Sequence, residues 1–284
     1  MSTTLDPIAH RALVMHSEQT PSARHLQATQ DVIEGSRLWR LALTLGWLDI
    51  RLRYRGSVLG PLWLTLSTAV MVASLGFLYS ALFKINLHDY LPFIALSIVL
   101  WNFLSAVVGD ACLAFLQAEG MIRSIRMPFT VHAVRTVVRN ILVLAHNVIV
   151  IVAIWAIFNV WPGWDAALAV PGVLLWLVDS LAACLLLGAF CARFRDVPPI
   201  VGSIMQIAFF VTPIIWQPEL LQGASAAWLP ANPFYALIEI VRAPLLRGVP
   251  SAAVWSSALG YSVALCLAAW LLFARVRGRL AFWV

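Results

Sequence analysis

The sequence has little charge. Only 11% of its 284 residues are Asp, Glu, Lys or Arg, whereas 62% are hydrophobic. A water-soluble domain carries roughly 25% charged residues and about 45–50% apolar ones. The shortage of charge excludes a surface that faces water on all sides, and it predicts a protein embedded in a membrane.

Lysine is almost absent, and this excludes a nucleotide-hydrolysis loop. The single lysine, Lys84, is followed by Ile85 and lacks the glycines and the Ser or Thr of a phosphate-binding loop. The sequence also lacks a zinc-protease motif and a nucleophile elbow. The four cysteines lie in apolar stretches without zinc-ligand spacing. We therefore predict no catalytic residue, no cofactor site and no metal site in this chain.

Long hydrophobic runs are abundant. A membrane-spanning helix needs about 20 apolar residues, and six stretches approach or exceed that length: 56–83, 90–109, 140–164, 166–192, 197–218 and 248–274. Asp179 interrupts the fourth stretch, and the fifth contains Pro213 and Pro218. The pattern predicts an all-α integral membrane protein with six transmembrane helices.

Arginine is unevenly distributed among the segments that flank these stretches. It is concentrated in residues 37–55, 123–139, 193–195 and 275–279, whereas the alternate loops hold only Lys84, Arg242 and Arg247. Because positive residues favour the cytoplasmic side, this bias places both termini in the cytoplasm. Basic loops that face an anionic leaflet also explain the net charge of +6 better than nucleic-acid binding does.

The region before the first stretch divides into two parts. Residues 1–35 are polar and hold no apolar core of signal-peptide length, so we expect a mobile cytoplasmic tail. Residues 36–55 repeat leucine at helical spacing, with arginines in a neighbouring sector. Such a helix lies in the membrane plane, or it packs on the spans as a soluble-type helix does. Asp49 is expected to pair with Arg53 one turn later. The arginines of this predicted helix are Arg37, Arg40, Arg51, Arg53 and Arg55.

Residues 119–128 form a short segment between the second and third stretches. Gly120 and Pro128 mark its ends as helix stop and restart signals. Apolar side chains flanked by arginines on a loop that faces water favour a docking site for a partner, with an ordinary tight turn as the alternative. The candidate residues are Met121, Ile122, Arg123, Ile125 and Arg126.

Residues 217–250 are too apolar for a simple loop, and their five prolines prevent a spanning helix. We expect two short helices that dip into the outer leaflet and bend at Asn232 and Pro233. Backbone that leaves a helix at that depth must be covered by protein or line water, so we predict a gate or a pore lining. The candidate residues are Glu219, Trp228, Asn232, Phe234, Tyr235, Glu239 and Arg242.

Aromatic and ionisable side chains within the spans are further candidates. Aromatic residues near span ends are usually interfacial anchors, although their flat faces also suit sugar rings. An ionisable residue in mid-membrane is costly and often functional, with an interhelical hydrogen bond as the alternative role for Asp179. The channel or substrate candidates are Trp63, Tyr79, Trp101, Phe103, Asp179 and Trp216.

The stretch RYRGSVLGPLW at residues 53–63 resembles the type-2 ATP-binding-cassette export permeases that move lipid-linked polysaccharides such as O-antigen. The resemblance continues at 88–92, 118–122, 139–147, 193–196 and 232–242, and it covers residues 36–284 as one transmembrane export domain. It implies a homodimer in the bacterial inner membrane, with ATP and Mg²⁺ handled by a separate ATPase subunit. In that family, residues 36–55 would be the interface helix, 119–128 the coupling helix and 217–250 a pair of periplasmic gate helices.

Two other functions stay open at this point. A drug or small-lipid exporter of the same superfamily would share the architecture. An ion-driven secondary transporter would use Asp110, His146 or Asp179 as a proton relay, although inverted repeats are not evident in the sequence.

Overall fold

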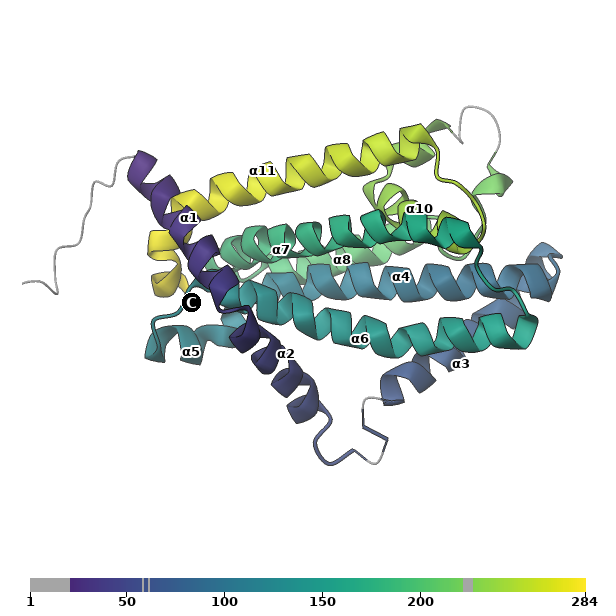
Figure 1. Cartoon of the computed structure of the whole chain (residues 1–284), viewed down its shortest axis with the longest axis horizontal. Coiled ribbons are helices and arrows are strands. Elements are labelled where there is room, and N and C mark those ends of the chain that lie inside the picture. Colours follow the sequence, from purple (N-terminus) through teal and green to yellow (C-terminus); the bar gives the residue numbers. More distant parts are fainter. Residues whose placement is uncertain (1–20, 58, 61, 222–226) are drawn as a thin grey trace, which may run out of the picture.

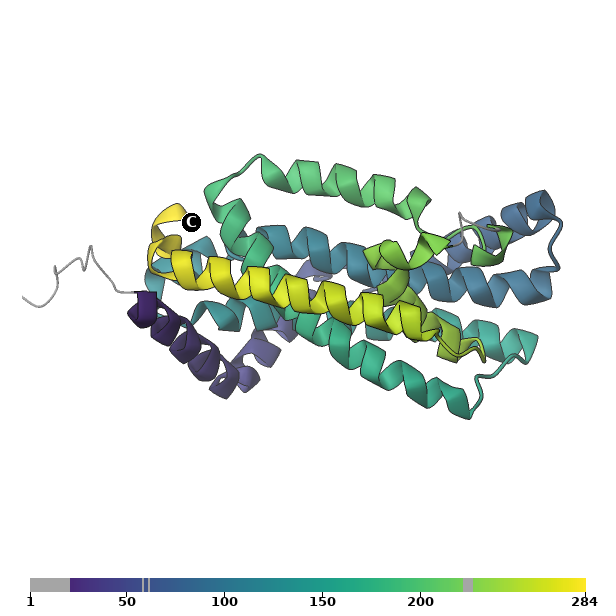
Figure 2. The same ribbon diagram turned by 90° about the horizontal axis from the view of Figure 1, so that it is seen from above.

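The computed structural model describes residues 21–57, 59–60, 62–221 and 227–284, and these residues form helices and connecting segments without any β-strand. Long helices lie side by side along one axis (Figures 1 and 2). They are α3 (Leu62–Phe83), α4 (Leu87–Leu113), α6 (Phe129–Phe158), α7 (Ala169–Arg193) and α11 (Ala252–Trp283).

Shorter helices lie at the two ends of this bundle and along its side. One end carries α1 (Pro21–Arg37), α2 (Trp39–Arg53), α5 (Glu119–Ser124) and the turn at residues 194–196, and we call it the basic end. The opposite end, where α3 meets α4 and α6 meets α7, is called the far end. The remaining helices are α8 (Val197–Val211) and α10 (Pro233–Leu245), with 3-10 turns η2 (Leu116–Ala118), η3 (Trp164–Leu168), η4 (Pro218–Leu220) and η5 (Leu229–Ala231).

Five helices among the described residues are long and apolar enough to cross a membrane. They correspond to the predicted stretches one, two, three, four and six, so the all-α membrane class is confirmed. The fifth stretch forms α8, whose 15 residues rise about 22 Å, which is short of a hydrocarbon core of about 30 Å. The sixth crossing therefore stays a prediction.

The third long helix begins earlier than its sequence indicates. It starts at Phe129 rather than Asn140, and so includes Arg135 and Arg139. Both arginines bind carboxylates on neighbouring helices, which compensates for placing their charge inside the bundle. Hydropathy cannot detect such pairing, because the partners are distant in sequence.

The predicted mobile tail is wrong for residues 21–35. These residues belong to α1, which packs against α6 and α11 at the basic end. Its Asp31 is fully buried and binds groups from both of those helices. The polar composition that suggested a solvated tail reflects partners that the sequence alone does not reveal. Residues 1–20 lie outside the described part of the chain.

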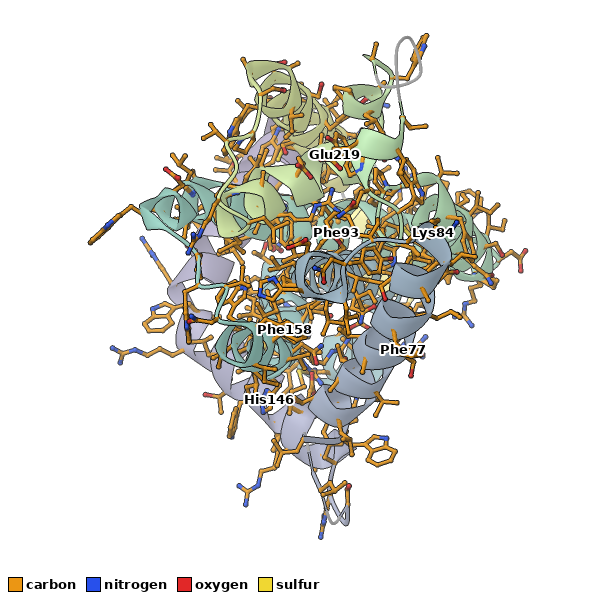
Figure 3. The ribbon with its side chains drawn as sticks, turned by 90° about the vertical axis from the view of Figure 1, so that its right-hand side faces the viewer. Phe77, Lys84, Phe93, His146, Phe158 and Glu219 are labelled. Carbon is orange, nitrogen blue, oxygen red and sulfur yellow. The ribbon has the colours of Figure 1, made fainter. Side chains whose placement is uncertain are left out.

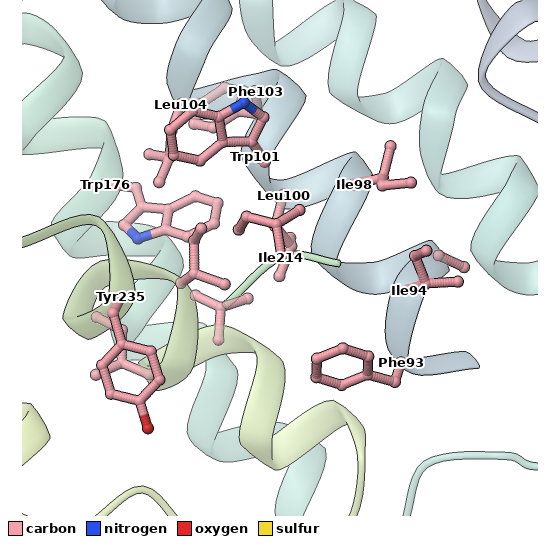
Figure 4. Close-up of a cluster of buried hydrophobic side chains, with 14 of the residues drawn as sticks. Phe93, Ile94, Ile98, Leu100, Trp101, Phe103, Leu104, Trp176, Ile214 and Tyr235 are labelled. Carbon is pink, nitrogen blue, oxygen red and sulfur yellow. The ribbon is translucent and has the colours of Figure 1, made fainter. Parts of the chain in front are cut away.

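The larger of the core clusters joins α4, α7, α10 and the segment that follows α8. Figure 4 shows Trp176 beside Phe103 and Leu104, with Tyr235 on α10 below them. The rings of Phe103 and Trp176 stack at 5.5 Å, and the indole N–H of Trp176 donates to the carbonyl oxygen of Leu237 at 2.9 Å. This packing fixes α10 against the spans near the far end.

Candidate functional site

Residues 119–128, predicted as the coupling helix and called the coupling segment below, begin with the six-residue helix α5 at the basic end. Arg123 pairs with Glu119 at 2.9 Å and donates to the carbonyl oxygen of Val284 at 2.6 Å. Because Val284 follows the last residue of α11, this bond attaches α5 to the end of α11. Ile125 follows in extended conformation and is 55% exposed, and the neighbouring Arg126 is also exposed. Met121 and Ile122 lie on α5 and are half-buried. The predicted surface-exposed apolar site is therefore carried mainly by Ile125.

Helix α2, which contains most of the predicted interface helix, has two separate apolar surfaces. Ala42, Gly46 and Ile50, spaced by four residues, are buried against α6. A Cβ at Gly46 would lie 2.8 Å from the Val138 side chain, so only glycine permits this close approach. Of the five leucines that defined the predicted apolar face, Leu45 is half-buried. The other four stay exposed: Leu38, Leu41, Leu48 and Leu52. Since α2 packs on α6 through its small residues, its leucines remain free to contact lipid.

The arginines predicted for the interface helix lie on or beside α2 and are all exposed. Arg40, Arg51 and Arg53 belong to α2, Arg37 ends α1, and Arg55 follows α2. The guanidinium of Arg40 lies 5.4 Å from the ring centre of Trp39. An exposed surface that combines leucines with arginines is the composition expected of a helix at a lipid headgroup layer.

Asp49 connects α2 to the spans and does not pair with Arg53 as predicted. Arg135 on α6 donates to both carboxylate oxygens of Asp49, at 2.7 and 2.5 Å. One turn further along α6, Arg139 lies 2.9 Å from Asp110 of α4. The side-chain amide of Asn140 also donates to Asp110 at 2.9 Å. These pairs link α2 to α6 and α6 to α4 at the basic end.

At the far end, Asn232 begins α10 as an N-cap. Its side-chain oxygen accepts from the backbone N–H groups of Phe234 and Tyr235 at 3.0 and 3.2 Å, and Pro233 occupies the first helical position. Its side-chain amide donates to the hydroxyl of Thr212 at 3.0 Å. The predicted break at this position is confirmed as a helix start. Where the other short helix was predicted, between residue 217 and this break, the described residues form the 3-10 turns η4 and η5, and residues 222–226 lie outside the described part of the chain.

Arg242 of α10 is a fully buried charged side chain at the far end, with 1% of its side-chain surface exposed. It pairs with Glu239 at 2.6 Å and donates to the hydroxyl of Ser97 on α4 at 2.8 Å. It also donates to the carbonyl oxygen of Pro213 at 2.6 Å, and its guanidinium lies 4.7 Å from the ring centre of Phe93. Arg242 therefore holds α10, α4 and the segment after α8 together.

The chain leaves helical conformation after α8, between Thr212 and Trp216. Unpaired backbone groups are costly inside a membrane unless protein or water satisfies them. The carbonyl of Pro213 accepts from Arg242, and the carbonyl of Ile215 accepts from the hydroxyl of Tyr90. The segment is thus supported by side chains of α4 and α10.

Figure 3 looks onto the far end, with Phe93, Phe158 and Glu219 labelled on three different elements. A pocket of about 330 Å³ opens there, lined by residues that include Phe93, Glu219 and His88. One ring nitrogen of His88 lies 3.0 Å from the carbonyl oxygen of Phe158. Of the other predicted gate residues, Trp228 is exposed, whereas Tyr235 is buried.

A groove of about 460 Å³ runs between α3, α4 and α8. Aromatic rings line it at Trp101, Phe209 and Phe210, and its polar side chains are uncharged. The polar lining residues are Asn102, Ser105 and Gln206. None of the described residues that line the groove carries a charge. Aromatic faces beside amides and a hydroxyl can contact the C–H faces and the hydroxyl groups of sugars.

The six channel candidates do not converge on this groove. Trp101 lines it and contacts Phe209 and Phe234, at ring distances of 5.7 and 5.4 Å. Phe103 and Asp179 face the interior of the helix bundle instead of this groove, and Asp179 lines a separate pocket there, so their channel or substrate role stays a prediction. Phe103 stacks on Trp176, and Asp179 accepts from the hydroxyl of Ser262 at 2.7 Å. The remaining three lie elsewhere: Trp63 exposed on α3, Tyr79 stacked on Phe83, and Trp216 donating to the carbonyl of Phe210.

Comparison with known families places this geometry in context. The sequence profile described as ABC-2 type transporter matches residues 40–246, which is more than half of the chain. The chain belongs to the ABC-2 type transporter family. The matched region runs from α2 to α10, so it contains the coupling segment, the groove and Arg242. Helices α1 and α11 lie outside the match to this transporter family.

Named relatives of this ABC-2 chain cover most of its length. The O-antigen export system permease protein RfbA of Myxococcus xanthus is 26% identical over 205 residues, which is 72% of this chain and 79% of that protein. A protein of the same name from Klebsiella pneumoniae is 18% identical over 213 residues, covering 75% of this chain and 82% of that protein.

Sequence reasoning missed several residues that organise these sites. Asp31 was assigned to a tail, and Ser97 and Tyr90 looked like ordinary span residues. Asp49 could have been recognised as the single acid in a basic helix, which indicates an interhelical partner. Nothing in the local pattern identified its partner, Arg135.

Proposed function

We propose that this chain is the membrane permease of an ABC exporter for O-antigen or a related lipid-linked polysaccharide. Two copies of the chain enclose the export path in the bacterial inner membrane. A separate ATPase subunit, which binds ATP and Mg²⁺, powers the transport. The observation that carries the proposal is the match to named O-antigen export permeases over about four fifths of their own length.

The chemistry of the α3–α4–α8 groove supports a sugar-containing substrate. Its aromatic and uncharged polar lining offers stacking and hydrogen bonding without requiring a charged cargo. The apolar outer faces of α3 and α8 flank this groove, with exposed residues that include Leu66, Val70, Ile204 and Ile207. A second subunit placed against these faces closes the groove into a path.

The basic end is the cytoplasmic end in this proposal, because arginines of α2, α5 and the 194–196 turn gather there. Both termini lie on that side, and the segment 212–216 completes the sixth crossing after α8. The exposed Ile125 and Arg126 then face the ATPase subunit, while α10 faces the periplasm as part of the gate.

This topology is open to a labelling test. A cysteine introduced by Arg40→Cys or by Arg51→Cys should react with an impermeant reagent only from the cytoplasmic side. The cysteine introduced by Lys84→Cys should react only from the periplasm. All three side chains are exposed in the structure, so accessibility depends on the side of the membrane. Periplasmic labelling at Arg40→Cys or Arg51→Cys would contradict the orientation.

The partners of the candidate proton carriers argue against an ion-driven transporter. Asp110 is held by Arg139 and Asn140, Asp179 by Ser262, and His146 by the carbonyl oxygen of Leu142 at 2.7 Å. Each group is committed to helix packing, and none lines the groove. A drug or small-lipid exporter differs from the proposal only in its cargo, which the following experiment identifies.

Deletion of the gene tests the proposed cargo. Surface polysaccharide should disappear, and lipid-linked polysaccharide should accumulate on the cytoplasmic side, with both restored by the intact gene. The tagged chain should also co-purify with an ATP-binding subunit. Unchanged surface polysaccharide, with altered export of a drug or a simple lipid, would replace the proposed cargo with that alternative.

A further inference from the structure

A groove of about 300 Å³ lies beside α5 at the basic end. Its floor comes from the coupling segment and the start of α6. Its other walls come from helices that are far away in sequence, α1 and the end of α11. The lining residues are Glu34 from α1, Ile122, Ile125, Arg126, Met127, Pro128 and Phe129 from the middle of the chain, and Arg277 and Ala281 from α11.

Asp31 fixes α1 as a wall of this groove. Its carboxylate accepts from the backbone N–H groups of Phe129 and Thr130, at 3.2 and 3.0 Å, and from the Thr130 hydroxyl at 2.9 Å. It also pairs with Arg277 of α11 at 2.9 Å. The first turn of a helix leaves backbone donors without partners, so α1 supplies a cap for α6. One carboxylate thereby joins α1, α6 and α11.

Other contacts hold α1 along its length. A Cβ at Gly35 would lie 2.6 Å from the side chain of Thr130, so glycine allows α1 to approach the first turn of α6 closely. Ala28 is fully buried, and the ring of His25 stacks on Trp270 of α11 at 6.1 Å. Glu34 stays exposed on this anchored helix and faces the groove.

The two outer walls lie outside the residues that the family model matches. The match covers residues 40–246, whereas α1 ends at Arg37 and α11 begins at Ala252. The coupling segment lies within the matched residues, and Glu34, Arg277 and Ala281 add surface around it from outside the match. A surface built around a shared docking element is suited to distinguishing one partner from another.

We propose that α1 and the end of α11 form part of the docking surface for the ATPase subunit and select the cognate subunit. This inference rests on the proposed function, which supplies the ATPase. The occupant of the groove is a segment of that subunit with an apolar side chain next to a carboxylate. The apolar side chain packs on Ile122 and Ile125. The carboxylate binds Arg126, which is exposed and has no ion-pair partner among the described residues.

A photo-crosslinking amino acid placed at single positions tests the docking surface. The positions are Ile125 on the coupling segment, Glu34 on α1, and Ser36 as the control. Ser36 is two residues from Glu34, about 200° around the helix, and is also exposed. In membranes that contain the co-expressed ATPase subunit, we expect crosslinks to that subunit from positions 125 and 34, and at least five-fold less from 36.

The outcomes separate this inference from the proposed function. Crosslinking from 125 but not from 34 would overturn the role of α1 and leave the exporter proposal intact. Equal crosslinking from 34 and 36 would also overturn it, because the contact would then not be specific to the groove. Absence of crosslinks from all three positions would count against both proposals.

Asp31 provides a second, independent test. Asp31→Asn removes the ion pair with Arg277 and weakens the cap on α6, so crosslinking from position 34 should fall at least five-fold while crosslinking from 125 persists. Arg277→Lys retains a positive partner for Asp31 and should keep most of the crosslink. Membrane-inserted protein is quantified for each variant. Unchanged crosslinking from position 34 in a fully inserted Asp31→Asn variant would show that the contacts of Asp31 with α6 and Arg277 do not position α1.

Discussion

At the basic end, carboxylates on one helix bind arginines on another, whereas at the far end a buried arginine and a tyrosine bind backbone carbonyl oxygens. Asp31 and Asp49 connect intact helices through charged side chains. Arg242 and Tyr90 instead support the non-helical backbone at Pro213 and Ile215. The two ends of one bundle are thus held together by different partners.

This difference concerns what the side chains hold. At the basic end they link helices that run along the bundle, α4, α6 and α11, to one another and to α1 and α2. At the far end they hold a segment that has left helical conformation, between Thr212 and Trp216. Loss of a contact should therefore separate intact helices at the basic end and release non-helical backbone at the far end.

The largest effect is expected from Arg242→Ala. The substitution leaves the partly buried carboxylate of Glu239 and the carbonyl of Pro213 without their donor, and losing one member of a buried charge pair costs about 3–5 kcal/mol. Thermal unfolding of the purified protein should show this loss as a lower melting temperature.

Arg247→Ala is the matched control for Arg242→Ala. Arg247 also donates to a carbonyl oxygen at the far end, that of Trp161 at 2.7 Å, but it is exposed. Its loss should cost about 1 kcal/mol or less. Equal melting temperatures for the two variants would remove the distinction between a buried support and a surface bond at this end.

A smaller effect is expected at the basic end from the Asp49–Arg135 pair. The variants Asp49→Asn and Arg135→Gln, alone and together, should give a coupling free energy of about 1.5–3 kcal/mol, because the pair is bidentate and mostly buried. The exposed pair of Glu119 and Arg123 is the control, with an expected coupling of about 0.3–0.5 kcal/mol. Similar coupling free energies for the two pairs would show that the Asp49–Arg135 pair between α2 and α6 is worth no more than an exposed pair within one helix.

The smallest change in stability is expected from Phe234→Leu on α10. The variant keeps most of the apolar volume and removes the ring contact with Trp101, which is worth about 0.5–1.5 kcal/mol. If this contact closes the far end at rest, nucleotide-free vesicles should leak small solutes while assembly is preserved. Phe77→Leu, on the exposed face of α3, should stay tight. Tight vesicles with Phe234→Leu would assign the ring to packing alone.

The sequence was informative wherever local chemistry decides structure. Asn232 followed by Pro233 predicts a helix start, because the side chain caps free N–H groups and proline fits the first turn. Pro128 similarly marked the start of α6, whereas Gly120, predicted as a helix stop, lies inside α5. The positions of these features required no knowledge of distant contacts.

The remaining features depend on contacts between distant residues. Asp31 binds groups 98, 99 and 246 positions away, and Asp49 prefers Arg135, 86 positions away, to Arg53 one turn along its own helix. For this reason the polar residues 21–35 were predicted to be a tail although they form α1. For the same reason the third span was predicted to begin after Arg139, although α6 begins at Phe129. Phe103 and Trp101 are two residues apart, yet only Trp101 faces the groove, because Phe103 turns toward Trp176.

The shortness of α8 has a consequence for the backbone that follows it. Its 15 residues are about 8 Å shorter than the hydrocarbon core, and its outer side chains, such as Ile200 and Ile207, are apolar and exposed. In the proposed topology the non-helical residues 212–216 cover the remaining depth, where no water satisfies free backbone groups. The side chains of Arg242 and Tyr90 then do for this part of the crossing what helical hydrogen bonds do for the longer spans.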